Sequence, residues 1–192
     1  MTPGRLAVLS GPGGVGKSTV VRALHEILQG WTVSVSATTR PARPGEHDGI
    51  DYHFVTDDQF DRMIAEGAFL EWANFGGNRY GTLWSSVREP LETGRSVLLE
   101  IEIQGALAVK KEFPDAVLLF LHPPSFDTLR ARLRERGTDD PDRVRERLAL
   151  AEWELAQSTV FDHQVTNDDV DAAAVRIAEI LRSLDPSEPY PG

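Results

Sequence analysis

The sequence predicts an α/β domain in which a parallel β-sheet core is flanked by helices. Short apolar runs typical of buried strands recur along the chain, and stretches with helical patterning separate them. A strand, a helix and another strand in succession are the signature of a parallel sheet with right-handed crossover connections. The chain has 192 residues, of which 41% are apolar, and this is enough for one compact domain with a substantial core.

The first half of the chain starts with a strand and a helix around a glycine-rich turn and then becomes rich in strand signals. Residues 41–49 combine proline, glycine and charge, which is typical of a loop. The elements expected here are a strand at 6–10, a helix to about residue 28, strands at 33–38 and 52–55, a helix at 57–66, and a hairpin that begins at 69 and turns at Gly76 and Gly77.

The second half of the chain alternates strands and helices again. Asp140 followed by Pro141 indicates a helix start, because it places a capping side chain before a proline at the first helical position. The elements expected here are strands at 96–101 and 116–121, a helix at 105–112 between them, helices from about 125 and from 140, a weak strand at 164–166 and a final helix at 169–184.

These elements divide the chain into a core and two additions. We expect a parallel α/β core from residues 1–33, 84–125 and 148–184, a small β-rich insert at 34–83, a region rich in arginine at 126–147, and a flexible, proline-rich tail at 185–192. No internal repeat interrupts this organisation.

Composition and charge exclude several classes of function. A net charge of −10 argues against a nucleic-acid partner, which requires a basic face. The chain has no cysteine, so it forms no disulfide or thiolate metal site, and its histidines lack the spacing of metal ligands. No apolar run approaches the ~18 residues of a membrane span and no signal segment is evident, so we expect a cytoplasmic protein without membrane association.

Residues 11–18, GPGGVGKS, match the phosphate-binding pattern G-x-x-x-x-G-K-[ST] and are called the P-loop below. They lie between a predicted strand and a predicted helix, as this motif requires, so that backbone N–H groups and the helix N-terminus surround a phosphate. We expect Lys17 to reach the β and γ phosphates of ATP and Ser18 to bind Mg²⁺. The predicted cradle consists of Gly11, Pro12, Gly13, Gly14, Val15, Gly16, Lys17, Ser18 and Thr19.

The P-loop identifies a donor site but no reaction, since ATPases, GTPases and kinases share it. In the insert, Arg40 and Arg43 stand beside prolines that stiffen the loop, and two such arginines form a bidentate clamp for phosphate. Taken alone, this run is also compatible with an ordinary charged loop. Glu71 lies between Leu70 and Trp72, so its carboxylate is expected to be half-buried and either paired with an arginine or used for a ligand.

Several motifs in register resemble the guanylate kinase family, which belongs to the P-loop nucleoside monophosphate kinases. They span about residues 5–184 and are S-x-x-T-R-x-x-R-x-G-E at 36–46, GIDYHF at 49–54, Glu71, YGT at 80–82, IQG at 103–105, R-L-x-x-R-G-T at 132–138 and TND at 166–168. The resemblance implies a GMP-binding insert, a helical lid at 126–147, and transfer of the γ-phosphoryl group of ATP to GMP with Mg²⁺; dGMP is a further possible acceptor.

The resemblance also assigns roles to residues by their motif position. The GMP phosphate would be held by Arg40, Arg43, Tyr52 and Tyr80, with Glu46 orienting the arginines. Guanine would be read by Ser36, Glu71, Thr82 and Glu102. The transferring phosphoryl group would be neutralised by Arg132, Arg136 and Arg147, which would act together with the catalytic Lys17 of the P-loop. Asn167 would lie near the adenine, and Ser18 with Glu100 would hold the metal.

The chain departs from the family pattern at two positions and leaves two alternatives open. Gly13 stands where the family commonly has serine, and Glu102 where it usually has aspartate. Related domains that serve only as protein-interaction scaffolds lack an intact P-loop, whereas this chain keeps Lys17 and Ser18. A P-loop kinase for another acceptor, such as a phosphorylated sugar, would not need Glu71 beside the YGT motif. We expect no obligate protein partner.

Overall fold

The computed structural model describes residues 4–135 and 141–184, and its centre is a five-stranded, entirely parallel sheet. The strand order is β2 (Trp31–Val33), β7 (Ser96–Glu100), β1 (Leu6–Ser10), β8 (Val117–His122) and β9 (His163–Thr166). The predicted parallel sheet with flanking helices is therefore confirmed. The carboxyl ends of its strands form the edge at which the P-loop begins.

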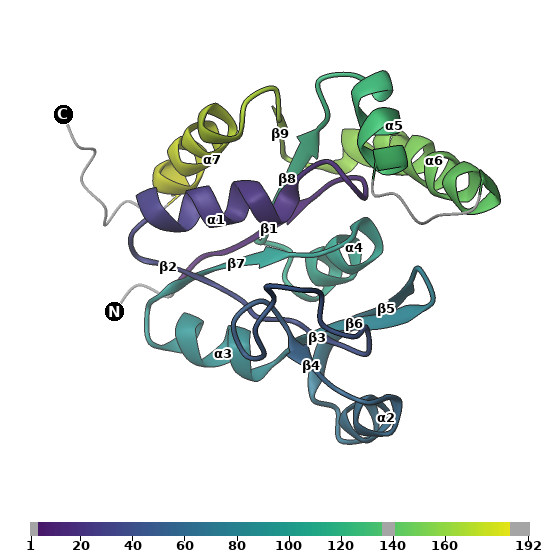
Figure 1. The fold of residues 1–192 in the computed structure, drawn as a ribbon. Helices are drawn as coiled ribbons and strands as arrows, with labels where there is room; N and C mark the ends of the chain where they lie inside the picture. Colours follow the sequence, from purple (N-terminus) through teal and green to yellow (C-terminus); the bar gives the residue numbers. More distant parts are fainter. Residues whose placement is uncertain (1–3, 136–140, 185–192) are drawn as a thin grey trace.

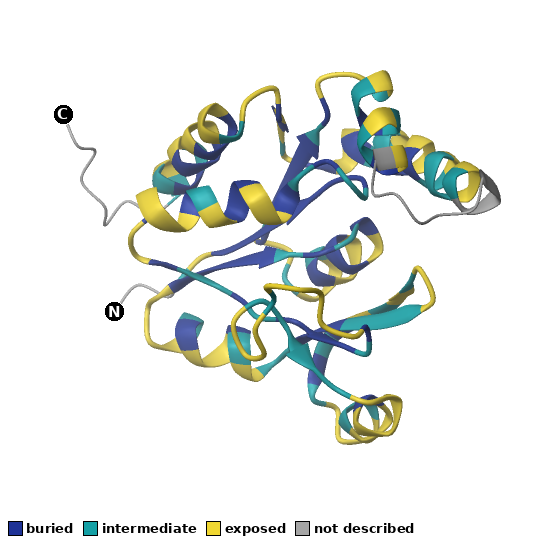
Figure 2. Cartoon of the chain, viewed as in Figure 1, coloured by how far each residue is buried: buried dark blue, intermediate teal, exposed yellow. Residues whose placement is uncertain are grey.

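Helices cover both faces of this sheet (Figure 1). On one face lie α1 (Lys17–Ile27) and α7 (Val170–Leu184), which pack against inward side chains such as Ala7 and Leu9. On the other face lie α3 (Ser85–Glu92) and α4 (Ile103–Glu112), against Leu6 and Val8. Successive β1 side chains thus point to opposite faces of the sheet. The side chains on both faces are buried, as expected for a central parallel strand (Figure 2).

A second sheet of four strands lies below the first in Figure 1. Its order is β4 (His53–Phe54), β3 (Ala37–Thr38), β6 (Asn78–Leu83) and β5 (Phe69–Phe75), and the β5–β6 pair is the predicted hairpin. Helix α2 (Asp57–Ala65) covers it and places Phe60 against Phe69, with ring centroids 4.5 Å apart. The insert therefore has a small hydrophobic core of its own, distinct from those on the two faces of the main sheet.

One expectation about these elements was wrong, and one helix was not predicted. The strand expected at 33–38 is two strands, because the chain leaves the main sheet after β2 and joins the second sheet as β3. Helix α3 was not expected from the sequence, since it contains Pro90, a residue that normally interrupts helices.

Helices α5 (Phe126–Glu135) and α6 (Pro141–Ala156) form a layer of their own at the P-loop end of the molecule (Figure 1). They pack on each other through Leu129, Leu133 and Ala151. A short 3-10 helix (Gln157–Val160) connects α6 to β9. The predicted tail at 185–192 lies outside the described residues. Among those described, no helix is both long and apolar enough to cross a membrane.

Candidate active site

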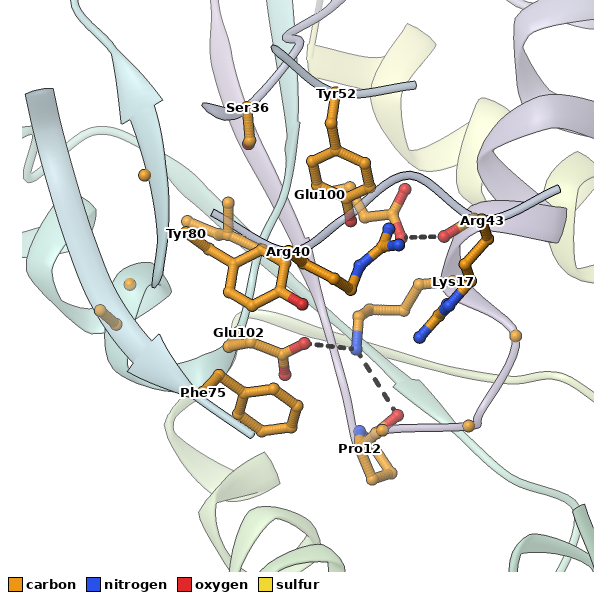
Figure 3. A pocket seen from close by; sticks show the side chains of 18 of the residues that line it. Pro12, Lys17, Ser36, Arg40, Arg43, Tyr52, Phe75, Tyr80, Glu100 and Glu102 are labelled. Atoms are coloured by element: carbon orange, nitrogen blue, oxygen red, sulfur yellow. Dashed lines mark hydrogen bonds and ion pairs between the residues drawn. The ribbon is translucent and has the colours of Figure 1, made fainter. Parts of the chain in front are cut away.

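A cavity of about 220 Å³ lies between the P-loop and the second sheet. It brings together predicted residues from segments that are far apart in the sequence (Figure 3). Its walls include Pro12, Gly13, Gly14, Gly16, Lys17, Ser18, Thr19, Ser36, Arg40, Arg43, Glu46, Tyr52, Glu71, Tyr80, Glu100, Glu102 and Arg147. Five predicted site residues that the structure describes are not on this wall: Gly11, Val15, Thr82, Arg132 and Asn167.

The P-loop is held from behind by side chains of distant segments. The Val15 carbonyl accepts hydrogen bonds from Asn167 Nδ2 at 2.8 Å and from an Arg132 guanidinium nitrogen at 3.1 Å. Gly16 has a φ of 100°, and a Cβ there would lie 2.7 Å from Asn167 Nδ2. Asn167 and Arg132, predicted near adenine and near the transferring group, therefore lie against the loop backbone. Arg136 lies outside the described residues.

Lys17 begins α1 and is buried at the floor of the cavity. Its Nζ donates to the Gly11 carbonyl at 2.5 Å. It also lies 3.6 Å from Glu102 Oε1 (Figure 3). The second carboxylate oxygen of Glu102, Oε2, is buried and has no hydrogen-bond partner among the described residues. The ammonium group is thus held between loop carbonyls and an acid, in the middle of the predicted phosphate path.

Two hard oxygen ligands meet beside Lys17. The Ser18 hydroxyl donates to Glu100 Oε1 at 2.6 Å, at the point where β7 ends. No group of three or more acidic, histidine or cysteine side chains that could hold a metal is found within residues 4–135 and 141–184. Mg²⁺ at nucleotide sites takes only one or two protein oxygens and completes its shell with phosphate and water. Ser18 and Glu100 therefore fit the predicted ion.

The arginines of the insert are fixed by Glu46. Arg40 makes a bidentate pair with Glu46, with both N···O distances at 2.9 Å, and Glu46 also accepts from the Arg43 backbone N–H at 2.7 Å. The Arg40 hydrogen bond holds the pKa of Glu46 below its ordinary value. The Arg40 guanidinium lies 5.4 Å from the centre of the Tyr52 ring, and Tyr80 meets Tyr52 edge-on at 6.0 Å. Two guanidiniums and two phenol rings thus converge on the same side of the cavity.

Among the described residues, the Glu71 carboxylate is hydrogen-bonded by Thr82, not paired with an arginine. The Thr82 hydroxyl and backbone N–H both donate to Oε1, at 2.6 and 3.2 Å. Oε2 lies against α4, where a Cβ on Gly105 would be 2.6 Å away. Burial raises the pKa of Glu71, and the Thr82 hydrogen bonds oppose that rise. Thr82, predicted to read guanine, is fully buried and supports Glu71 instead of lining the cavity.

Sequence reasoning missed two side chains near the P-loop. The Phe75 ring, on β5, lines the cavity and would be 3.7 Å from a Cβ at Gly13. Glu154, on α6, is 3% exposed and accepts a hydrogen bond from the Gly13 N–H. A signal for Glu154 was present in the sequence. It lies between Ala151 and Leu155, which with Leu148 form an apolar stripe at helical spacing, and a carboxylate is unexpected beside such a stripe.

Known proteins resemble this chain over nearly its whole length. The guanylate kinase family model matches residues 3–184. A guanylate kinase of Gloeobacter violaceus is 52% identical over 98% of this chain and 92% of its own length, and one of Rubrobacter xylanophilus is 49% identical over 96% of each. The crystal structure of guanylate kinase from Anaplasma phagocytophilum is 34% identical, covers 96% of this chain and 87% of its own, and superposes with a TM-score of 0.80.

Both the fold and the motifs around the cavity agree with these matches. The chain belongs to the guanylate kinase family.

Proposed function

We propose that the cavity is the site at which this guanylate kinase transfers the γ-phosphoryl group of ATP to GMP, giving ADP and GDP. One observation carries the proposal: the same cavity joins a P-loop lysine to an arginine pair and to a buried carboxylate. The P-loop holds the donor, the arginine pair holds the acceptor phosphate, and the carboxylate selects the base. Transfer needs these groups in line more than it needs covalent chemistry.

The donor side depends on Lys17. Without ATP, its ammonium contacts the Gly11 carbonyl and Glu102. When ATP binds, the ammonium contacts the β and γ phosphates instead, because they carry more negative charge. As charge develops on the transferring group, this contact becomes stronger, and that difference accelerates the reaction. Arg147 of α6 lies on the cavity wall and adds a second positive charge.

The metal site supports the same step. Ser18 Oγ and Glu100 would hold Mg²⁺, and the bound ion would neutralise charge shared between the phosphates. Glu100 stands at the carboxyl end of β7, the edge of the sheet at which ligands bind in open α/β folds. The two protein oxygens are therefore placed by the parallel sheet and by the first turn of α1.

The acceptor side selects both a phosphate and a base. Arg40 and Arg43 take the two anionic oxygens of GMP, with Tyr52 and Tyr80 as phenolic donors. Guanine offers two neighbouring donors, N1–H and the 2-amino group, whereas adenine offers a lone pair at N1. Glu71 accepts from the guanine donors when it is ionised, and its Thr82 hydrogen bonds favour that form. We place this activity in the cytosol, in purine nucleotide metabolism.

A turnover assay tests the proposal directly. ATP and Mg²⁺ are mixed with GMP, AMP, CMP or UMP in turn, and the products are identified by anion-exchange chromatography. We expect equal amounts of ADP and GDP with GMP and little turnover of the other three. Turnover of a different nucleotide in preference to GMP would assign another acceptor, and ADP formation without any acceptor would make the chain an ATPase.

A further inference from the structure

Glu154 is the most deeply buried carboxylate of the described residues and has no place in the reaction as outlined above. It is 3% exposed, compared with 9% for Glu71. It is absent from the wall of the active-site cavity and lines a second, smaller cavity of about 150 Å³ beside Glu102. A buried carboxylate destabilises a fold unless its hydrogen bonds compensate, so its presence here calls for a reason.

The environment of Glu154 favours its neutral form. Burial and the neighbouring Glu102 carboxylate raise the pKa of Glu154 to about 8, and the Lys17 ammonium and the Gly13 N–H oppose that rise. A neutral Glu154 has a carboxyl O–H available to the neighbouring Glu102 carboxylate, which contributes to its raised pKa. Its own Oε2 accepts from the Gly13 N–H at 3.3 Å. Glu154 thus bridges the P-loop and the acid that holds Lys17.

Gly13 is the part of the P-loop that needs such a support. It has no side chain, and the nearest atom to a Cβ built there is Phe75 Cζ, at 3.7 Å. Gly14 and Gly16, by contrast, lie so close to Leu133 and Asn167 that a Cβ at either position would be within 3 Å of them. Within the described residues, the hydrogen bond to Glu154 is the contact that fixes the Gly13 N–H.

The same helix carries a residue of the active site. Arg147 and Glu154 are seven residues apart on α6, which is about two helical turns, so they lie on one side of the helix. Arg147 lines the active-site cavity, whereas Glu154 lies behind the loop. The bond from Glu154 to Gly13 therefore links the position of the P-loop to the position of Arg147.

We propose that Glu154 is a positioning residue for phosphoryl transfer, which fixes the Gly13 peptide of the P-loop and the Arg147-bearing helix relative to each other. This inference rests on the proposed function of the cavity. Glu154 touches no substrate; it acts through the hydrogen bond that its side-chain oxygen accepts. A small displacement of reacting groups lowers the rate far more than it lowers affinity for a substrate held elsewhere.

Three variants separate this role from a merely structural one. Glu154→Gln keeps an oxygen acceptor and has an N–H donor for Glu102, Glu154→Ala removes both, and Glu152→Ala, at an exposed position of the same helix, is the matched control. We expect the Gln and control variants to keep kcat within about threefold of wild type, and the Ala variant to lose about tenfold or more, with KM for GMP changed less than about threefold.

Several results would overturn the inference. A folded Ala variant with wild-type kcat would do so, as would equal losses in the Gln and Ala variants, or a loss that lies only in KM for GMP. If the Ala variant does not fold, Glu154→Asp replaces it, because Asp keeps the carboxyl group but is one methylene shorter and so loses the reach to Gly13. The Asp variant is then expected to be slower than the Gln variant, and an equally fast Asp variant would contradict the role.

A measurement of ATP binding in the absence of GMP distinguishes a failure of the positioning role from a failure of the proposed function. Titration calorimetry with ATP and Mg²⁺ depends on the P-loop but not on the acceptor. If the wild type fails to phosphorylate GMP, the proposed function is wrong, and the positioning role is judged on ATP alone. It then requires weaker ATP binding by the Ala variant than by the Gln variant, and equal affinities would contradict it.

Discussion

The P-loop gathers its predicted phosphate contacts from one continuous segment, residues 11–19, whereas the insert gathers its contacts from segments spread over residues 36–82. The first site consists mainly of backbone with one lysine, and distant side chains support it from behind, at Gly13, Gly14 and Val15. The second consists of side chains from strands β5 and β6 and from the loop segments next to β3 and β4. A substitution that removes one of these supporting side chains can displace the P-loop backbone as a whole. A substitution in the insert, by contrast, changes one side-chain contact at a time.

The largest effect is expected at Lys17, the side chain on which the backbone cradle depends. Lys17→Ala removes a charge that contacts the transferring group, and we expect kcat to fall about 10²-fold or more while the fold is retained. Steady-state kinetics with saturating GMP measure the loss, and circular dichroism checks the fold. Lys111→Ala, at an exposed lysine of α4, is the control and should behave as wild type. Activity of the Lys17 variant within a few-fold of wild type would remove Lys17 from the mechanism.

A smaller and more selective effect is expected at Gly105, on the acceptor side. A Cβ there would be 2.6 Å from Glu71 Oε2, so Gly105→Ala must displace that carboxylate. Alanine suits a helix better than glycine does, and the thermal stability should therefore not fall. We expect kcat/KM for GMP to drop about tenfold or more while KM for ATP stays close to wild type.

A double-mutant cycle identifies the cause of the Gly105 effect. In a Glu71→Ala background, Gly105→Ala should have almost no further effect on GMP turnover, because the group that it displaces is gone. If the two losses simply multiply, Gly105 acts by another route, and the close approach of Glu71 to α4 has no part in base recognition.

The smallest effect is a change of stability with pH at Glu154. Its folded-state pKa of about 8 lies above the ordinary value of 4.5, so its contribution to stability is complete below pH 4.5 and is lost as the pH rises through 8. Glu154→Gln carries no ionisable group and avoids this loss. Without nucleotide, we expect the two proteins to have similar Tm values at pH 5 and the Gln variant to melt a few degrees higher, roughly 2–8 °C, at pH 8.5.

Differential scanning fluorimetry across this pH range measures the difference directly. Acidic groups that do not interact with Glu154 contribute equally to both proteins and cancel in the comparison. A Tm difference that is the same at pH 5 and pH 8.5 would show that Glu154 does not titrate in this range.

The contrast between the two sites also explains what could be predicted from the sequence. The P-loop was identified from residues 11–18 alone, because its chemistry requires glycines, a lysine and a serine at fixed spacing. Arg40 and Glu71 of the insert acquired a specific meaning only through the family resemblance, since a charged loop and a half-buried acid have ordinary explanations. The structure adds that Glu46 binds Arg40 and that Thr82 binds Glu71.

The remaining features depend on contacts between distant segments. Nothing in the local sequence indicates that Asn167 and Arg132 meet at the Val15 carbonyl, because the three residues belong to different elements. The strand expected at 33–38 divides between two sheets because each half finds a different partner, β7 for the first and β6 for the second. Local pattern predicts that a segment is extended, but pairing decides which sheet it joins.

If the P-loop binds the donor and the insert binds the acceptor, a change at Glu71 should alter the choice of base without altering ATP binding. Base selection by Glu71 is therefore the most direct test of this division. The measurement is kcat/KM for GMP and for AMP, together with KM for ATP, on the wild type and on Glu71→Gln. Gln keeps the size of the side chain but turns one acceptor into a donor, so we expect the GMP value and the GMP/AMP ratio to fall by about 10²-fold or more, with ATP binding retained. An unchanged GMP/AMP ratio in the Gln variant would show that Glu71 is a structural carboxylate and would contradict the account.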